Sequence, residues 1–112
     1  MVDCVFCKID AGEIPGDKLH DDDVCFAIRD IYPVAPTHLL IIPHEHIVSL
    51  DEPHEGVIGH LFQVADRMAQ QEGVDGSGFR LIINQGQDAG QTFPHVHVHL
   101  LGGKRLPWGD DS

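Results

Sequence analysis

The chain has 112 residues, the length of one small domain, and we expect residues 1–112 to fold as a single unit. Its formal net charge of −11 at pH 7 argues against a nucleic-acid-binding protein, because few basic groups are available to neutralise phosphates. The longest uninterrupted apolar run, Leu39 to Ile42, is far too short to cross a bilayer, so the sequence predicts no membrane segment.

Targeting and redox signals predict a cytoplasmic protein. The segment Met1-Val2-Asp3-Cys4 lacks the basic region and the apolar region with which a secretion signal begins. Three cysteines are an odd number, which fits poorly with a disulfide framework. We therefore expect reducing, intracellular surroundings.

The first part of the chain predicts a short helix followed by strands. Residues 4–11 carry a weak helical signal, and residues 17–20 suit a short strand that the acidic turn 21–23 would end. Residues 24–29 alternate in the manner of a strand. Residues 37–42 are apolar on both faces, which predicts a central strand covered on each side.

A long amphipathic helix is predicted over residues 53–72. Pro53 suits its first turn, and Gly73 suits its end. The apolar positions recur at helical spacing and form one broad stripe: Val57, Ile58, Leu61, Phe62, Ala65, Met68 and Ala69.

The last part of the chain predicts two further strands around a loop. Residues 79–84 and 94–101 have the pattern of strands, and residues 85–92 form a loop that contains Gly86 and Gly90. Strands on either side of one long helix, without strand–helix alternation, indicate an α+β fold with a mainly antiparallel sheet.

Three histidines alternate with apolar residues near the C-terminus. In a strand, His95, His97 and His99 would share one face, because successive side chains point to opposite sides. Imidazole can act as nucleophile, acid, base or metal ligand near neutral pH. Polar side chains confined to one sheet face beside a glycine-containing loop are typical of a pocket wall, although a solvated strand face or an adventitious metal patch is the simpler alternative.

Cys4 and Cys7 form a Cys-x2-Cys pair at the start of the chain. No βαβ unit precedes them, so a thioredoxin-type redox pair is not supported. A closed tetrahedral zinc site would need two more ligands, and a pair of reduced, half-buried cysteines is the alternative.

The motif His-φ-His-φ-His-φ-φ at residues 95–101, where φ is an apolar residue, resembles the signature of the histidine-triad (HIT) superfamily. Further segments resemble its Hint-like branch: Phe6 with Ile9, Glu13-Ile14-Pro15, Asp30-Ile31, Pro36-Thr37-His38, Ile42-Pro43 with His46-Ile47, Asn84 with Gly86, Gly90-Gln91-Thr92, Gly102-Gly103 and Trp108. The resemblance implies a five-stranded antiparallel sheet with one long helix and a short N-terminal helix. It also implies a homodimer that joins two such sheets.

The resemblance implies roles for three histidines. The central histidine of the motif is the family's nucleophile, which corresponds to His97 here. His99 would donate to a phosphate oxygen and is a candidate acid for the leaving group. His38 resembles a histidine that supports the nucleophile.

The same resemblance implies a nucleotide pocket. The expected phosphate donors are Asn84, the amide of Gly90 and the hydroxyl of Thr92. Asp30 would accept hydrogen bonds from the ribose hydroxyls. Apolar side chains would enclose the base, although each alone is better explained as an ordinary core residue: Phe6, Ile9, Ile28, Ile31 and Leu40. Trp108 would either reach a partner subunit's pocket or cap the monomer core.

A zinc site also follows from the resemblance. Some members of the superfamily hold structural Zn²⁺ with ligands that correspond to Cys4, Cys7, His46 and His95. His44 is an alternative to His46, but a continuing strand would point it to the opposite face. No catalytic metal is expected.

Together these features predict a hydrolase of purine nucleoside 5′-phosphoramidates, AMP–amine conjugates in type, that works through a nucleotidyl-His97 intermediate. Cleavage of dinucleoside polyphosphates is an alternative. A nucleotide- or protein-binding regulator with incidental hydrolysis is another. Neither a nucleic acid nor a membrane is expected as a partner.

Overall fold

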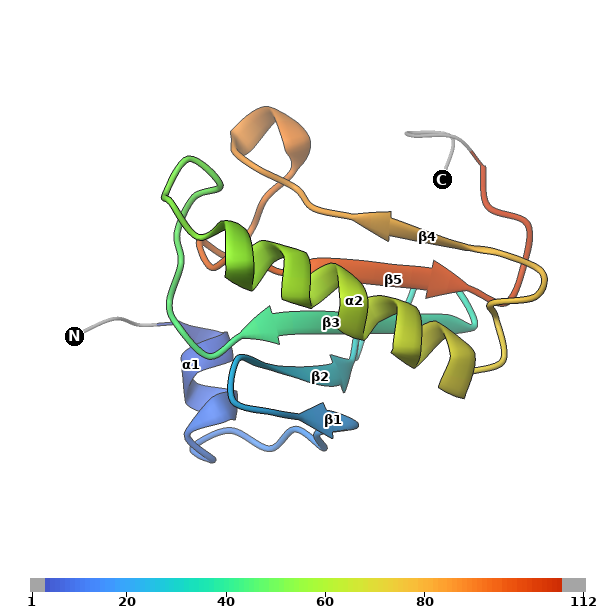
Figure 1. Cartoon of the computed structure of the whole chain (residues 1–112), viewed down its shortest axis with the longest axis horizontal. Helices are drawn as coiled ribbons and strands as arrows, with labels where there is room; N and C mark the ends of the chain where they lie inside the picture. Colours follow the sequence, from blue (N-terminus) through green and yellow to red (C-terminus); the bar gives the residue numbers. More distant parts are fainter. Residues whose placement is uncertain (1–3, 108–112) are drawn as a thin grey trace.

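The structure is a computed structural model that describes residues 4–107. Five strands form one antiparallel sheet in the order β1-β2-β3-β5-β4, with a short and a long helix (Figure 1). The helices and strands are α1 (Val5–Asp10), β1 (His20–Asp21), β2 (Cys25–Arg29), β3 (Thr37–Pro43), α2 (Glu55–Gln71), β4 (Phe79–Ile82) and β5 (Val98–Gly102). A single 3-10 turn covers Gln87–Ala89. The α+β fold predicted from the sequence is confirmed.

β3 is the central strand, as its apolar sequence predicts. All seven of its residues are buried, and it pairs with β2 on one side and β5 on the other. Leu40 lies opposite Ile28 of β2 and opposite His99 of β5. Because paired residues of antiparallel strands point to the same side, these three side chains share one face of the sheet.

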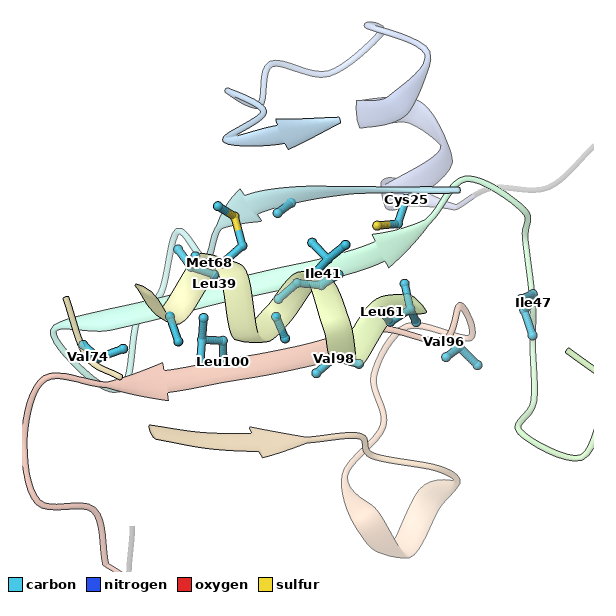
Figure 2. Packing of buried hydrophobic residues seen from close by; sticks show 14 residues of the cluster. Cys25, Leu39, Ile41, Ile47, Leu61, Met68, Val74, Val96, Val98 and Leu100 are labelled. Atoms are coloured by element: carbon cyan, nitrogen blue, oxygen red, sulfur yellow. The ribbon is translucent and has the colours of Figure 1, made fainter. Parts of the chain in front are cut away.

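α2 covers the other face of the sheet, here called the α2 face, and encloses the larger core with it (Figure 1). Figure 2 shows Leu39, Ile41 and Leu100 packed among the side chains of this helix. The helix ends as predicted, because Gly73 follows its cap with φ +73°, a backbone conformation that favours glycine. The predicted stripe is right except that Phe62 is 37% exposed.

The face without α2, here called the pocket face, is only partly covered, by α1. A smaller buried cluster joins this helix to β2 and β3: Cys4, Phe6, Phe26, Ile28, Leu40 and Ile42. The remaining area of the pocket face is left for the cavity described below.

Three strands have a boundary that differs from the prediction by more than one residue. β1 overlaps the expected 17–20 only at His20. β4 stops at Ile82, the last of its residues that pairs with β5. β5 begins at Val98, so His95 and His97 precede it. Pro43 ends β3, and the chain beyond it bonds to Val96, whose N–H donates to the Ile47 carbonyl at 2.7 Å.

Candidate active site

A cavity of about 580 Å³ opens on the pocket face between α1, the loop after β2 and the glycine-containing loop. His97 and His99 line it. Nine of the residues predicted to bind substrate also line it: Phe6, Ile9, Ile28, Asp30, Ile31, Leu40, Asn84, Gly90 and Thr92. His38 is not among the lining residues, and Trp108 lies outside the described residues.

Several lining residues were not predicted as site residues. Phe93 stands edge-on to Phe6 with 5.3 Å between ring centroids, and both rings line the cavity. Ile14, Pro15, Leu19 and Tyr32 extend the wall. Ile14 and Pro15 belong to the segment Glu13-Ile14-Pro15, which resembles the Hint-like branch. That resemblance is the one sequence signal that could have identified them as lining residues.

His97 presents one ring nitrogen without a proton. Its Nδ1–H donates to the His95 carbonyl at 2.7 Å, so the neutral ring carries its lone pair on Nε2. Phe6 packs edge-on against this ring at 4.9 Å between centroids. Burial lowers the pKa of His97, and the bond to the carbonyl offsets only part of that effect. The ring is therefore neutral and oriented at neutral pH.

A chain of hydrogen bonds sets the tautomers of two more histidines. The backbone N–H of Val34 donates to His38 Nδ1 at 3.1 Å, which leaves the proton of that ring on Nε2. His38 Nε2–H then donates to His99 Nδ1 at 3.0 Å, so His99 carries its own proton on Nε2. The His38 ring therefore bonds to His99, and its expected support of His97 stays a prediction.

The pKa of His99 lies well below the ordinary value of a histidine. Burial, followed by the nearby rings of His97 and His38, lowers this pKa to about 4, against a weak opposing effect of Asp30. Burial also lowers the pKa of His38. All three rings are neutral at pH 7, and an anion bound beside them would raise their pKa values again.

Asp30 stands at the edge of this histidine group. One carboxylate oxygen lies 3.4 Å from His38 Nε2, and the other accepts the backbone N–H of Tyr32 at 2.8 Å. Since Asp30 also lines the cavity, its carboxylate is placed to accept hydrogen bonds from a diol while remaining fixed by its own loop.

The glycine-containing loop is held by a side chain that sequence reasoning did not single out. Gln91 accepts the backbone N–H of Gly86 at 2.8 Å and donates to the Phe93 carbonyl at 3.2 Å. Gly86 and Gly90 adopt φ values of +90° and +81°, which few other residues tolerate. Asn84, Gly90 and Thr92 border the cavity as expected.

Basic side chains contribute little to the cavity. Arg29 is the one basic residue among the described residues that line it, and its guanidinium donates to Glu72 at 2.7 Å. Arg80 donates to the Pro107 carbonyl at 2.6 Å, toward the end of the chain. Backbone amides and imidazoles are therefore the main groups available to a phosphate here.

A second group of side chains lies against α1 and can hold a metal ion. Its donor atoms all lie within 4.8 Å of one another and come from Cys4, Cys7, His46 and His95. This is the set that the sequence predicted, and His44 does not belong to it. Cys4 Sγ is 3.3 Å from His95 Nδ1, and Cys7 Sγ is 3.3 Å from His46 Nδ1.

The tautomer of His95 suits a metal ligand. Its Nε2–H donates to the Pro43 carbonyl at 2.9 Å, so the lone pair on Nδ1 faces the two sulfur atoms. Burial, followed by contact with Cys4, raises the pKa of the Cys7 thiol to about 11. Adjacent buried thiols resist ionisation unless a cation compensates them. Two sulfur and two imidazole donors form the donor set of a closed tetrahedral zinc site.

Comparison with known proteins gives the class of the chain. The family model described as HIT domain matches residues 11–106. The chain belongs to this family, and its hydrolase relatives make it an enzyme.

Among its relatives is the purine nucleoside phosphoramidase of Escherichia coli (strain K12), which is 45% identical over 105 residues, 91% of this chain and 88% of that protein. An uncharacterized HIT-like protein of Synechococcus elongatus is also 45% identical, over 95% of each chain.

Solved structures agree with the fold. A HIT family hydrolase from Clostridium thermocellum superimposes with a TM-score of 0.91 at 40% identity, covering 98% of both chains. A histidine triad protein from Clostridium difficile gives a TM-score of 0.91 at 43% identity, also over 98% of both chains. Within residues 4–107, neither helix combines the length and the apolar character needed to cross a membrane.

Proposed function

We propose that the chain hydrolyses purine nucleoside 5′-phosphoramidates. The observation that carries the proposal is the His97 ring, whose Nδ1–H is bound to the His95 carbonyl while the ring lines a largely apolar cavity. This arrangement supplies an uncharged nucleophile beside phosphate donors and a base-sized enclosure. The relative from Escherichia coli, named for the same activity, supports the choice of substrate class.

The reaction would proceed by two displacements at phosphorus. His97 Nε2 attacks in line, the P–N bond breaks, and the nitrogen leaves as an amine with a proton from His99. Water then attacks the nucleotidyl-His97 phosphorus and gives a proton to the now neutral His99, the P–N bond to His97 breaks, and the nucleoside monophosphate and a neutral His97 are released. Because the pKa of the free His99 ring is about 4, the negative phosphoryl group must raise this pKa before His99 can act as an acid.

The remaining lining residues would position the nucleotide. Asp30 accepts hydrogen bonds from the ribose hydroxyls, while Asn84, Gly90 and Thr92 donate to the phosphoryl oxygens. The base occupies the apolar part of the cavity, formed by Phe6, Ile9, Ile28, Ile31 and Leu40 together with Phe93. His38 orients His99 through the bond between their rings.

The direct test is to trap the covalent intermediate. A His99→Gln variant incubated with AMP–lysine phosphoramidate is expected to accumulate a chain heavier by one nucleotidyl group, detected by intact mass spectrometry. Peptide mapping should locate the group on His97. Turnover by a His97→Ala variant at the parent rate would refute the proposal.

Cleavage of dinucleoside polyphosphates is the competing enzymatic function. The scarcity of cations at the cavity disfavours it, because a longer polyphosphate carries more charge to neutralise. We expect kcat/KM for AMP–lysine phosphoramidate to exceed that for a diadenosine polyphosphate. A higher kcat/KM for the diadenosine polyphosphate would favour dinucleoside polyphosphates as the substrate class.

We further propose that Cys4, Cys7, His46 and His95 hold a structural Zn²⁺ ion. The ion would fix α1 and His95, whose carbonyl accepts the bond from His97. Metal analysis of protein purified without added zinc should find about one ion per chain, and one fewer in a Cys4→Ala variant. Equal, substoichiometric zinc in both proteins would end this proposal.

A homodimer is also part of the proposal. β4 lies at one edge of the sheet, and it pairs with β5 alone among the described strands. Such an edge can continue a sheet into a second subunit. Sedimentation equilibrium should give twice the chain mass of 12.3 kDa.

A further inference from the structure

A second group of histidines surrounds the acidic turn between β1 and β2. His20 Nε2 and His60 Nε2 lie 2.7 Å and 2.8 Å from the same carboxylate oxygen of Asp22. The histidines belong to separate elements, β1 and α2. Nothing in the proposed hydrolysis uses these three residues.

This group lies on the sheet face away from the cavity. His20 is paired with Ala27, which is buried in the core beneath α2, so both side chains point toward α2. His60 projects from α2 toward the same turn. The side chains of His20, Asp22 and His60 remain 23%, 26% and 30% exposed, so an ion from solvent can reach them.

Asp22 is held in place independently of the histidines. Its other carboxylate oxygen accepts the backbone N–H groups of Val24 and Cys25, at 2.7 Å and 2.9 Å. Burial alone would raise the pKa of Asp22, but the bonds from His20, His60 and the backbone outweigh burial and lower it below its usual range. The carboxylate is therefore ionised and pre-oriented.

The donor set is that of a transition-metal site. Two imidazole nitrogens and one carboxylate oxygen, with room for water, suit Zn²⁺ and neighbouring divalent ions. The donor atoms of His20, Asp22 and Cys25 lie within 4.8 Å of one another, and His60 adds its nitrogen beside the same oxygen.

We propose that His20, Asp22 and His60 form a binding site for a divalent transition-metal ion, separate from the cluster of Cys4, Cys7, His46 and His95. In the ion-free chain, both Nε2 atoms donate protons to Asp22. On binding, Nε2 of each neutral ring gives its lone pair to the ion and the ring proton moves to Nδ1. The bound ion connects α2 to the β1–β2 turn.

Zinc binding by a Cys4→Ser, Cys7→Ser double variant tests the site, because that variant removes two donors of the other cluster. Isothermal titration with Zn²⁺ should show one ion per chain, while adding His60→Gln should weaken binding at least ~10-fold. The glutamine is a matched change, because its amide can still donate to Asp22 but offers the metal no nitrogen lone pair. A His54→Gln control should bind zinc as the double variant does.

If the cysteine variants do not fold, crystallography on the unmodified chain tests the same site. Crystals grown with Zn²⁺ should show an anomalous peak between His20, Asp22 and His60. Absence of this peak at millimolar zinc, or equal zinc affinity with and without His60→Gln, overturns the proposal. Phosphoramidate turnover is measured separately, so its loss or retention leaves this conclusion unaffected.

Discussion

The two faces of the sheet differ in what their side chains are bonded to. On the α2 face, Leu39, Ile41 and Leu100 are fully buried and belong to the apolar core. On the pocket face, His38, His97 and His99 are also largely buried, but every ring bonds to a backbone group or to another ring. Because one strand supplies side chains to both faces, Leu100 stabilises the fold while its neighbour His99 lines the cavity.

The comparison teaches that burial serves two purposes in this protein. Apolar burial on the α2 face favours folding, at roughly 25 cal/mol per Å². Burial of imidazoles on the pocket face opposes folding at low pH, because it lowers their pKa values, and it keeps the proposed nucleophile, His97, uncharged. Substitutions on the two faces should therefore have separable effects on stability and on activity.

The largest expected effect is on activity, from the pocket face. A His97→Asn variant retains a side-chain N–H that can bond to the His95 carbonyl but lacks the attacking nitrogen. We expect kcat for AMP–lysine phosphoramidate to fall at least ~10³-fold, about 4 kcal/mol, with little change in unfolding free energy. Steady-state kinetics and urea denaturation measure the two quantities, and His54→Gln serves as a control with unchanged kcat.

The next effect is on stability, from the α2 face. Leu100→Ala removes a side chain that is fully buried beneath α2, so the free energy of unfolding should fall by about 3 kcal/mol. Denaturant unfolding measures the loss. Phe62→Ala, at a position on α2 that is 37% exposed, should cost less than about 1 kcal/mol. Equal losses for the two variants would contradict the burial argument.

The third effect is a pH dependence of the unfolding free energy, and it arises from His99. In the folded chain its pKa is about 4 and in the unfolded chain about 6.5, so the unfolded state binds the proton more tightly. The unfavourable contribution of His99 to the free energy of folding is absent well above pH 6.5, grows as the pH falls, and levels off below about pH 4.

Comparison with a variant that cannot titrate isolates this contribution. Between pH 7.5 and pH 5, the parent should lose about 2 kcal/mol more unfolding free energy than His99→Gln does. Chemical denaturation of both proteins at the two pH values gives the difference. An identical loss in the two proteins would place the His99 pKa near its ordinary value.

The smallest effect is an ion pair at the end of α2. Arg29, at the end of β2, donates with both terminal nitrogens to the Glu72 carboxylate, at 2.7 Å and 2.9 Å. Since the arginine side chain is 54% exposed, the pair should contribute only about 0.5 kcal/mol. A double-mutant cycle with Arg29→Met and Glu72→Gln measures it, and the coupling should weaken further in high salt.

Sequence reasoning predicted the fold because local patterns and tertiary packing agree. The apolar run at residues 37–42 became the central strand, and Gly73 ends α2 because a positive φ is needed there. The cavity residues followed from the family resemblance, since Ile28 or Leu40 alone is indistinguishable from a core residue. Only the pairing of β2 with β3, and of β3 with β5, places Ile28 and Leu40 on the face that carries His99.

The features that sequence reasoning did not predict depend on contacts between residues distant in sequence. The strand predicted from residue 94 begins at Val98, which pairs with Ile41, because Val96 bonds instead to Ile47, beyond the end of β3. His38 lies opposite Leu101, two pairs along from the Leu40–His99 pair, and its ring reaches His99 along the same face of the sheet. No sequence pattern reports which ring a histidine contacts across two strands.

The amide of Val34 has a consequence for how substrates are selected. It belongs to the connection between β2 and β3 that also carries Asp30, so the group that would hold the sugar and the donor that orients His38 are held by one stretch of backbone. A ribose bound to Asp30 would therefore steady the segment whose amide orients His38 and, through that ring, His99. Analogues without sugar hydroxyls should therefore react slowly even when saturating, and chemistry at phosphorus would depend on whether the ribose is seated.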